Sequence, residues 1–467
     1  MRLSHGSPAL SATFDDPNLV SAGGLAPVLA LAAQCRLGGL VAEKLTLKDP
    51  GGVNAVVKVP ALVGGMVAGA DSIADMDLLR HGGMARLFAG IRAPSTLGTF
   101  LRAFTFGHVR QLDSIASSLL TGLAAAAPLL PGADQVAYLD VDDTVREVHG
   151  YAEQGAGFGY SGVRGLNALL ATISTPLAAP VIAAARLRRG AAYSPRGAAR
   201  LLTEALGTAR AAGAGGPDRA GLVIVRADSA YYTHDMVAAA RRGGARFSIT
   251  AKMTATVKAA IASIDESAWT PIHYPRAIFD EAEQRWISDA EVAEVGFTAF
   301  TGRRQAEHVT ARLIVRRVRR LPAAGTAAGQ GELFAAHRHH AVFTDSPLPL
   351  LAAETSHRGH AIVEQVIADL KNGPLAHLPS GKFAANSAWL VLATMAFNLI
   401  RAAGTLASPF HARATTATLR TQLIGVPTRL ARSGRRLRLH LPHDWPWEQA
   451  WRRLFDATCG PPTPASP

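Results

Sequence analysis

The sequence predicts a mixed α/β protein with a helical region before its sheet and a basic region after it. Three observations support this class. A helical periodicity runs up to Ala124, strand-like and helix-like segments alternate between Gln135 and Thr250, and acidic residues follow apolar runs. The 467 residues are 48% hydrophobic and 18% charged, which is enough for a large core and predicts two or three domains.

The helical region covers the first 130 residues. From Pro27 to Ala124, apolar residues recur three and four positions apart. Ser95 and Thr96 precede an amphipathic helix on which Arg102 can face a phosphate. An ordinary helical bundle with a solvated basic face explains this pattern equally well.

The next segment, 131–251, has the strand and helix order expected of a sheet with helical crossovers. The order is β-β-β-α-β-α-β, and acids follow its first and fourth strands. The predicted elements are strands at 136–142, 166–173 and 181–187, a helix at 195–212, a strand at 222–227, a helix near 236–240 and a strand at 246–249. The first three strands predict an antiparallel meander.

After residue 251 the alternation stops and later resumes. Short β-prone pieces and a Gly/Ala-rich loop predict a β-rich insertion over 252–346. Helix-like segments at 358–371 and 383–401 follow, and the second is interpreted as a buried helix because polar residues interrupt its apolar run. The remaining tail is basic, since ten arginines and three acids lie between Arg401 and Pro467.

Charge and cysteine content limit the classes of function. The net charge of +13 and the isoelectric point near 10.3 are expected of a protein that binds a polyphosphate. Cys35 and Cys459 are far apart, so neither a disulfide framework nor a zinc site is predicted, and a cytoplasmic protein is expected. The Gly155–Gly165 stretch lacks the Lys-Ser/Thr of a nucleotide-binding loop, so no nucleotide cofactor is expected, and no membrane partner either.

Two acids near the end of the first strand are candidate metal ligands. Asp140 and Asp142 are two residues apart and therefore lie on one face of the strand. A turn at the end of the strand would account for Asp143, but it explains less well why Asp140 lies inside an apolar run, where an unpaired carboxylate is costly.

Further candidate site residues follow the fourth strand and lie on one predicted helix face. Asp228 comes directly after the apolar run 222–227, at the carboxyl edge where the sites of α/β sheets gather. His357, His360, Glu364 and Lys371 are spaced by three, four and seven residues, and this spacing places them on a single face.

These residues resemble a known family, the transposases of bacterial insertion sequences with a DDE triad, and specifically the insertion-sequence thirteen-eighty family. The resemblance covers most of the chain. It is carried by the segments 138–144, 225–229, 363–371, 419–420 and 445–447. Related transposases with a Tyr-x-x-Arg-x-x-x-Glu-x-x-x-x-x-x-Lys signature imply a ribonuclease-H-like catalytic core interrupted by a β-rich insertion. The signature's Tyr and Arg are His357 and His360 here, and Arg358 lies nearby.

The resemblance implies a division of the chain and roles for its residues. The expected regions are a helical N-terminal DNA-binding region (1–130), the first part of the core (131–251), the β-rich insertion (252–346), the second part of the core carrying the Glu helix (347–402) and a basic C-terminal region (403–467). Asp142, Asp228 and Glu364 are implied as the catalytic metal ligands, with Asp140 as a further candidate. The implied DNA contacts are Lys371, His357, His360, Arg358, Arg102 and Trp286.

The activity that the resemblance implies is cut-and-paste DNA transposition. Two Mg²⁺ ions, for which Mn²⁺ can substitute, would support strand cleavage at the terminal inverted repeats and transfer of the freed 3′-OH to target DNA. A hairpin step at the ends would require a base to stack on an aromatic residue, for which Trp286 is the candidate, although a core position is the more common one for tryptophan. Two DNA ends imply a homodimer in the synaptic complex.

Two alternatives remain open from the sequence. Residues 140–144 also match the D-x-D-x-T strand of haloacid-dehalogenase-type phosphatases, in which Asp140 would be the nucleophile and Asp142 the general acid. Against this reading, about 135 residues precede the strand and the basic tail has no purpose for a small substrate. The other alternative is an inactive DNA-binding relative.

Overall fold

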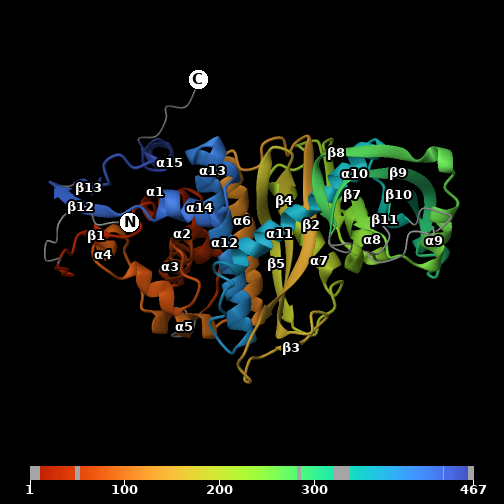
Figure 1. Cartoon of the computed structure of the whole chain (residues 1–467). Helices are drawn as coiled ribbons and strands as arrows, with labels where there is room; N and C mark the ends of the chain where they lie inside the picture. Colours follow the sequence, from red (N-terminus) through yellow and green to blue (C-terminus); the bar gives the residue numbers. More distant parts are fainter. Residues whose placement is uncertain (1–10, 48–52, 281–284, 320–336, 435, 461–467) are drawn as a thin grey trace.

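The computed structural model describes residues 11–47, 53–280, 285–319, 337–434 and 436–460. The molecule is elongated (Figure 1). Helices from the N-terminal region and the C-terminal segments form one end, a large mixed sheet occupies the middle, and the strands of residues 270–344 form the other end.

The N-terminal region is helical, as the apolar periodicity predicts. Its elements are β1 (Leu19–Val20), α1 (Leu25–Gln34), α2 (Leu37–Lys44), α3 (Ala55–Ala68), α4 (Met84–Leu87), α5 (Pro94–Arg102) and α6 (Phe106–Ala126), with a 3-10 turn at Ala74–Leu79. Pro94 stands at the first position of α5, where its missing N–H costs no hydrogen bond.

The central sheet has ten strands among the described residues, in the order β3-β4-β2-β6-β7-β11-β10-β9-β8, with β5 paired to β4. The strands are β2 (Val136–Glu147), β3 (Gly157–Phe158), β4 (Arg164–Thr175), β5 (Ala178–Arg189), β6 (Leu222–Ala227), β7 (Arg246–Thr250), β8 (Thr270–Asp280), β9 (Arg285–Ala299), β10 (Val309–Arg319) and β11 (His337–Thr344). β2, β4 and β5 form the predicted antiparallel meander, and β2, β6 and β7 run parallel.

The β-prone segment after residue 251 continues the same sheet. β11 pairs antiparallel with β7, and β10, β9 and β8 follow outward from it. These strands are therefore hydrogen-bonded, through β11, to the strands that carry the candidate acids.

The helices that pack with the sheet lie before, within and after residues 252–346 in the sequence. They are α7 (Ala198–Ala211), α8 (His234–Arg242), α9 (Ala255–Ala262), α10 (Leu350–Arg358), α11 (Ile362–Lys371) and α12 (Phe383–Ala407). The segment predicted as one helix at 358–371 is broken, because a 3-10 turn at Gly359–Ala361 separates α10 from α11. Gly359 packs closely there, since a Cβ at this position would lie 2.7 Å from the Arg226 guanidinium.

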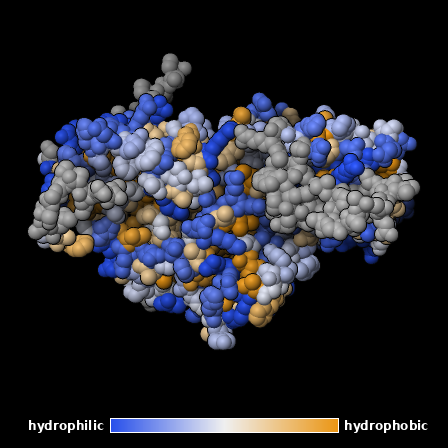
Figure 2. Space-filling model, viewed as in Figure 1, coloured by the Kyte–Doolittle hydropathy of each residue, from blue (hydrophilic) through white to orange (hydrophobic). Residues whose placement is uncertain are grey.

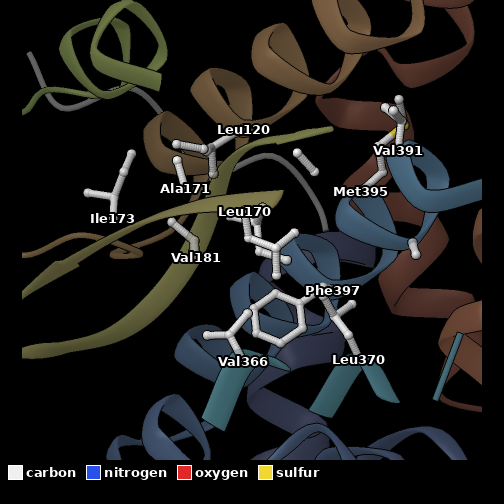
Figure 3. Packing of buried hydrophobic residues seen from close by; sticks show 14 of the residues in the cluster. Leu120, Leu170, Ala171, Ile173, Val181, Val366, Leu370, Val391, Met395 and Phe397 are labelled. Carbon is white, nitrogen blue, oxygen red and sulfur yellow. The ribbon is translucent and has the colours of Figure 1, made fainter. Parts of the chain in front are cut away.

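α12 is the central helix of the core. It is long and apolar enough to cross a membrane by composition alone, but 89% of its most apolar window is buried inside the protein, as the sequence predicts. It packs against α6 and α3 from the N-terminal region and against β5 from the sheet. Figure 3 shows Val391, Met395 and Phe397 of α12 in the cluster that also holds residues of α6, β4, β5 and α11. The N-terminal helices and the sheet thus share one hydrophobic core.

The C-terminal segment returns to the N-terminal helices. It comprises α13 (Pro409–Arg413), α14 (Thr416–Leu419), a π-helical turn (Arg420–Ile424), β12 (Thr428–Ser433), β13 (Arg436–His440) and α15 (Glu448–Cys459). β1, β12 and β13 form a small antiparallel sheet, and α15 packs against α1 and α12.

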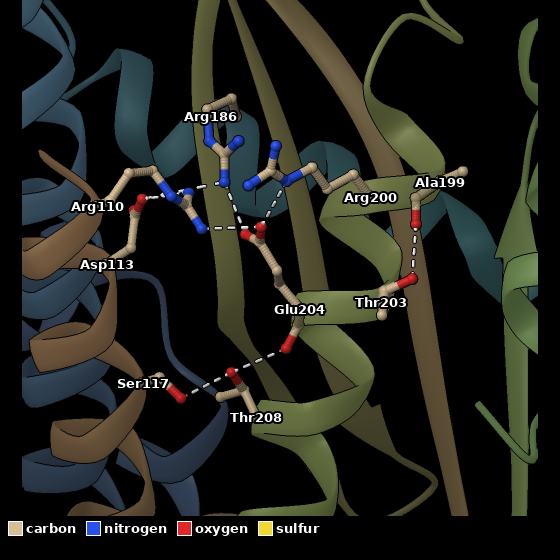
Figure 4. Close-up of polar contacts among 9 residues, drawn as sticks. All are labelled: Arg110, Asp113, Ser117, Arg186, Ala199, Arg200, Thr203, Glu204 and Thr208. Atoms are coloured by element: carbon tan, nitrogen blue, oxygen red, sulfur yellow. Dashed lines mark hydrogen bonds and ion pairs between the residues drawn. The ribbon is translucent and has the colours of Figure 1, made fainter. Parts of the chain in front are cut away.

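An ion-pair network joins α6, β5 and α7 on the flank of the sheet (Figure 4). Arg110 lies 2.6 Å from Asp113 and 2.8 Å from Glu204, and Arg186 lies 2.6 Å from Glu204. Most of the molecular face in Figure 2 is hydrophilic, with hydrophobic residues in small patches over its middle.

Candidate active site

A buried ion pair lies beneath the candidate acids. Asp140 on β2 is directly opposite Arg226 on β6, and the guanidinium donates two hydrogen bonds of 2.7 Å to the two carboxylate oxygens. Arg226 also donates to the Ser356 carbonyl at 2.6 Å and stacks over Tyr138, and the His360 Nδ1 lies 3.0 Å from Asp140. Burial alone would raise the pKa of Asp140, but the Arg226 charge and the bonds from His360 and Arg226 hold it below its usual value.

This arrangement bears on Asp140, which the sequence predicts as a further candidate metal ligand. Its side chain is 0% exposed and both of its oxygens are engaged by Arg226, so the geometry favours a structural ion pair over a further metal ligand. The Arg226 cation on the neighbouring strand offsets the unfavourable free energy of burying the Asp140 carboxylate in the apolar run.

Asp142 and Asp228 come together through strand register. The last parallel pair between β2 and β6 is Val141 with Ala227, so the two aspartates occupy the next position on each strand. Neighbouring strands lie about 4.8 Å apart, so the two side chains start from adjacent backbones. Asp228 accepts a hydrogen bond from the Ala230 N–H at 3.0 Å, which caps the turn after β6.

Asp142 is half-buried and Asp228 is exposed, and both hold protons more tightly than usual. Burial raises the pKa of Asp142 to about 6, and the negative charges of Asp228 and Asp143 add to this effect. The pKa of Asp228 is also raised, again by burial first and with a contribution from Asp143. His360 opposes both shifts through its charge when protonated, so this histidine lies within electrostatic reach of both acids.

A second buried network, which the sequence analysis does not predict, surrounds Asp143. The Tyr231 hydroxyl donates to Asp143 at 2.7 Å, Arg188 lies 2.8 Å from the same carboxylate, and Asn167 bonds to both Arg188 and Asp143. The predicted end of this strand at Asp142 is wrong, because β2 continues to Glu147, and the alternative of a turn at Asp143 does not hold, because Asp143 is buried within the strand. The clue in the sequence is the group of arginines, Arg186, Arg188 and Arg189, at the end of the otherwise apolar β5.

The third predicted acid is not joined to the aspartate pair. Glu364 lies in the first turn of α11 and is exposed, and Lys371 is the last residue of the same helix. Within the described ranges, no group of three or more His, Cys, Asp or Glu is placed to hold a metal ion. Glu364 follows His360 by four residues, and His360 lies in the 3-10 turn that precedes α11.

Two residues predicted to contact DNA have partners inside the protein. The His357 ring lies 3.0 Å from the Ser248 hydroxyl and 2.9 Å from that of Thr250, one bond at each ring nitrogen. Burial, above all, lowers the pKa of His357 to about 3, so the ring is neutral. Arg358 donates to Glu354 at 2.7 Å and stacks over Tyr274. These contacts favour a structural role over a DNA contact for His357.

Arg102 and Trp286 are two further predicted DNA contacts. Arg102 is exposed at the end of α5 and donates to the Thr99 hydroxyl, and α5 lies among the N-terminal helices, away from β2 (Figure 1). Trp286 lies on β9, but its side chain is outside the part of the chain that the structure describes.

The aspartate pair fits a divalent cation. Carboxylate oxygens are hard ligands, and the negative charge of Asp228 disfavours ionisation of the half-buried Asp142, so a cation between the two carboxylates would stabilise their charged forms. The structure thus supplies two candidate ligands, and Glu364 would complete the set only after a rearrangement.

The comparisons with known proteins agree with this chemistry. A family model described as transposase DDE domain group 1 matches residues 4–458, which is nearly the whole chain. No curated protein matches this chain significantly. DDE transposases generally use divalent metal ions, and their substrate is DNA. The chain therefore belongs to the group 1 family of DDE-domain transposases and is a metal-dependent polynucleotidyl transferase.

Proposed function

We propose that this transposase binds the ends of its own insertion sequence and catalyses strand cleavage and strand transfer with Asp142, Asp228 and Glu364. The observation that carries the proposal is the parallel register of β2 and β6, which brings Asp142 and Asp228 to adjacent positions. Two Mg²⁺ ions are the proposed cofactors, and Mn²⁺ can replace them. When bound, the pair of cations supplies activation of the attacking group and stabilisation of the leaving 3′ oxygen.

Glu364 joins the aspartates, in this proposal, when DNA binds. His360 connects the start of α11 to Asp140, and Glu364 follows it by four residues. The break at Gly359–Ala361 provides a place at which α11 can be reoriented without unfolding α10. Support for the movement comes from the present exposure of Glu364.

The protein side chains hold and orient the reacting groups. The Asp140–Arg226 pair ties β2 to β6 and to the carbonyl of Ser356, which fixes the base of the site. Lys371, at the end of the Glu364 helix, is the proposed contact to the DNA end. The net charge of +13 favours association with the DNA backbone as a whole.

The finer assignments rest on the sequence resemblance. They are membership of the insertion-sequence thirteen-eighty family, a ribonuclease-H-like core with residues 252–346 as its insertion, cut-and-paste transposition at terminal inverted repeats, a homodimeric synaptic complex and a cytoplasmic location. The N-terminal region 1–130 and the basic region 403–467 are the proposed DNA-binding regions.

The test uses the whole chain and a duplex that carries the ends of its own element. With Mg²⁺, the wild-type protein should nick the ends and join them to target DNA, and a denaturing gel should separate nicked, hairpin and joined products. Asp228→Ala and Glu364→Gln should each abolish nicking. Glu448→Gln is the matched control, because Glu448 also stands exposed in the first turn of a helix.

If Glu364→Gln nicks as well as the wild type, Glu364 is not a catalytic residue. If Asp228→Ala nicks as well as the wild type, the proposal is overturned. Hairpin products would establish a hairpin route, and joined products formed without them would exclude it. The phosphatase alternative gains no support from the structure, because its nucleophile would be Asp140, which is buried with both oxygens bound to Arg226.

A further inference from the structure

Several aromatic side chains are exposed on one side of the candidate site. We call Tyr151, Phe158 and Tyr160 the aromatic arm; they belong to the segment between β2 and β4. Tyr151 is 100% exposed, and Phe158 and Tyr160 are each 67% exposed. Tyr193, in the turn after β5, is exposed to the same degree. Large exposed aromatic side chains that cluster in this way mark a binding surface more often than a stability element.

The backbone of the arm is held in place. Arg164 donates to the carbonyls of Gly150 and Tyr151, and the Gln154 N–H donates to the Gly381 carbonyl at 2.9 Å. Gly155 has a φ of +83° and packs so closely on α12 that a Cβ would lie 2.9 Å from the Phe383 ring. The rings are therefore presented by an ordered segment, and a ligand that stacks on them does not have to order it first.

The arm is attached to the sheet that carries the aspartates. β3 pairs with the start of β4, which pairs in turn with β2, and Gly157 of β3 and Glu147 of β2 both lie opposite Gly165. Asp142 lies on the same strand as Glu147, so the arm continues the sheet beyond the strand that holds this acid. Partial burial raises the pKa of Tyr160 to about 12, and the contribution of the charges of Asp143, Asp142 and Asp228 agrees with this placement.

The surroundings of the arm suit a nucleic acid strand. Arg189 and Arg196 are exposed at the end of β5 and in the turn that follows it. Gly190, between β5 and that turn, donates its N–H to the Gly155 carbonyl at 2.9 Å, so the turn and the arm lie side by side. Alternating positive charge and aromatic surface is the combination that binds single strands, since arginines track the phosphates and rings stack on bases.

We propose that the aromatic arm is a stacking platform for unpaired bases of the DNA strand that is cut at Asp142 and Asp228. This role rests on the proposed function. It gives the exposed aromatic arm a ligand class, unpaired DNA bases, in addition to the role of the three acids. Tyr160 and Phe158 supply ring faces, and the anchoring of the segment on α12 fixes their position relative to the acids.

The test measures binding rather than cleavage. Fluorescence anisotropy compares the affinity of the metal-free whole chain for a dT 20-mer and for an abasic 20-mer, which has the same phosphates and no bases. The wild-type protein should bind the dT strand about fivefold or more tightly than the abasic strand, because stacking on aromatic side chains needs a base. The Phe158→Ala/Tyr160→Ala variant should lose this preference and keep its affinity for the abasic strand.

Two variants serve as controls. Tyr160→Phe keeps the ring without the hydroxyl and should retain the preference for dT. Leu177→Ala removes another large exposed apolar side chain, in the turn between β4 and β5 at the opposite end of these strands from the arm, and it should also retain the preference. Circular dichroism checks that each variant is folded.

Equal binding of the dT and abasic strands by the wild-type protein would overturn the inference. So would an arm variant that changes the oligomeric state in size-exclusion chromatography and keeps the preference for dT, because the arm would then be a protein interface. If either of these results is found and the wild-type chain still nicks its element ends, the stacking inference fails and the proposed function stands. If the wild-type chain prefers dT but never nicks its element ends, the proposed function fails and the stacking surface stands.

Discussion

Asp140 and Arg226 lie opposite each other on two neighbouring parallel strands and form a two-bond ion pair at the base of the candidate site. Both side chains are almost fully buried. The pair ties together β2 and β6, and the proposed metal ligands Asp142 and Asp228 lie two residues after Asp140 and Arg226. It therefore links the stability of the sheet to the placement of Asp142 and Asp228.

Removing one partner of this pair should be strongly destabilising. Arg226→Met leaves Asp140 as a buried, uncompensated carboxylate, and the expected loss is about 3–5 kcal/mol of unfolding free energy. Thermal unfolding followed by circular dichroism should show a clear drop in Tm. The double variant Asp140→Asn/Arg226→Met should recover part of that drop, because the uncompensated charge is gone. A single variant as stable as the wild type would show that the pair does not hold the strands.

Neutralising Asp142 should stabilise the metal-free protein while it removes activity. The folded-state pKa of Asp142 is about 6, above the ordinary value of 3.8, so folding is favoured by the protonated form. The stabilisation from this group is full below pH 3.8 and is lost as the pH rises through about 6. Asp142→Asn should therefore be more stable than the wild type at pH 8, by up to about 3 kcal/mol.

The difference between Asp142→Asn and the wild type should shrink as the pH falls toward 4. Differential scanning calorimetry at several pH values, with a chelator present, measures it. Glu364→Gln is the comparison variant, since its side chain is exposed. A lower Tm for Asp142→Asn at pH 8 would contradict the assigned burial and charge repulsion at this position.

Metal binding should weaken in acid. A cation competes with the proton on Asp142, so the apparent affinity for Mn²⁺ should fall below about pH 6, by up to about tenfold per pH unit. Isothermal titration calorimetry of the whole chain at pH 7.5 and pH 5 gives the comparison. The Asp142→Asn variant should bind weakly at both values. Equal wild-type affinity at the two values would rule out Asp142 as a ligand.

The Asp143 network should contribute to stability through Tyr231. Tyr231→Phe removes the hydroxyl that donates to Asp143, and the loss of a buried bond to a charged group should cost about 1–3 kcal/mol. Tyr232→Phe, at the adjacent position, is the control. Thermal unfolding of the two variants decides the matter, and equal Tm values would mean that Asp143 is adequately held by Arg188 and Asn167.

Much of the fold was predictable because strand and helix periods are local signals. The strand at 222–227 was predicted with the bounds it has in the structure, and the β-β-β-α-β-α-β order and the burial of α12 are confirmed. The predicted end of β2 is wrong, because consecutive acidic residues are typical of a turn unless buried hydrogen-bond and ion-pair partners compensate them, and the sequence does not show those partners. The helix break at Gly359 depends on the approach of Arg226 from a strand 130 residues away, which no local pattern reveals.

The site was less predictable than the fold for the same reason. The pairing of Asp142 with Asp228 follows from the register of β2 and β6, and the sequence indicates only that both acids follow apolar strands. Whether Asp140 or Asp142 forms an ion pair depends on which residue of the neighbouring strand lies opposite each of them. Arg226 faces Asp140, so Asp142 is the one left with unneutralised charge.

The position of α12 has a consequence for how the chain is made. The helices α3 and α6 bury their apolar faces against a segment that begins at Phe383, so the first third of the chain cannot complete its interior while it leaves the ribosome. A polypeptide that ended before Phe383 would leave the apolar faces of α3 and α6 without their partner helix, and exposed apolar surface of this kind favours aggregation. Translation therefore has to pass α12 before the interior of the first third of the chain can close.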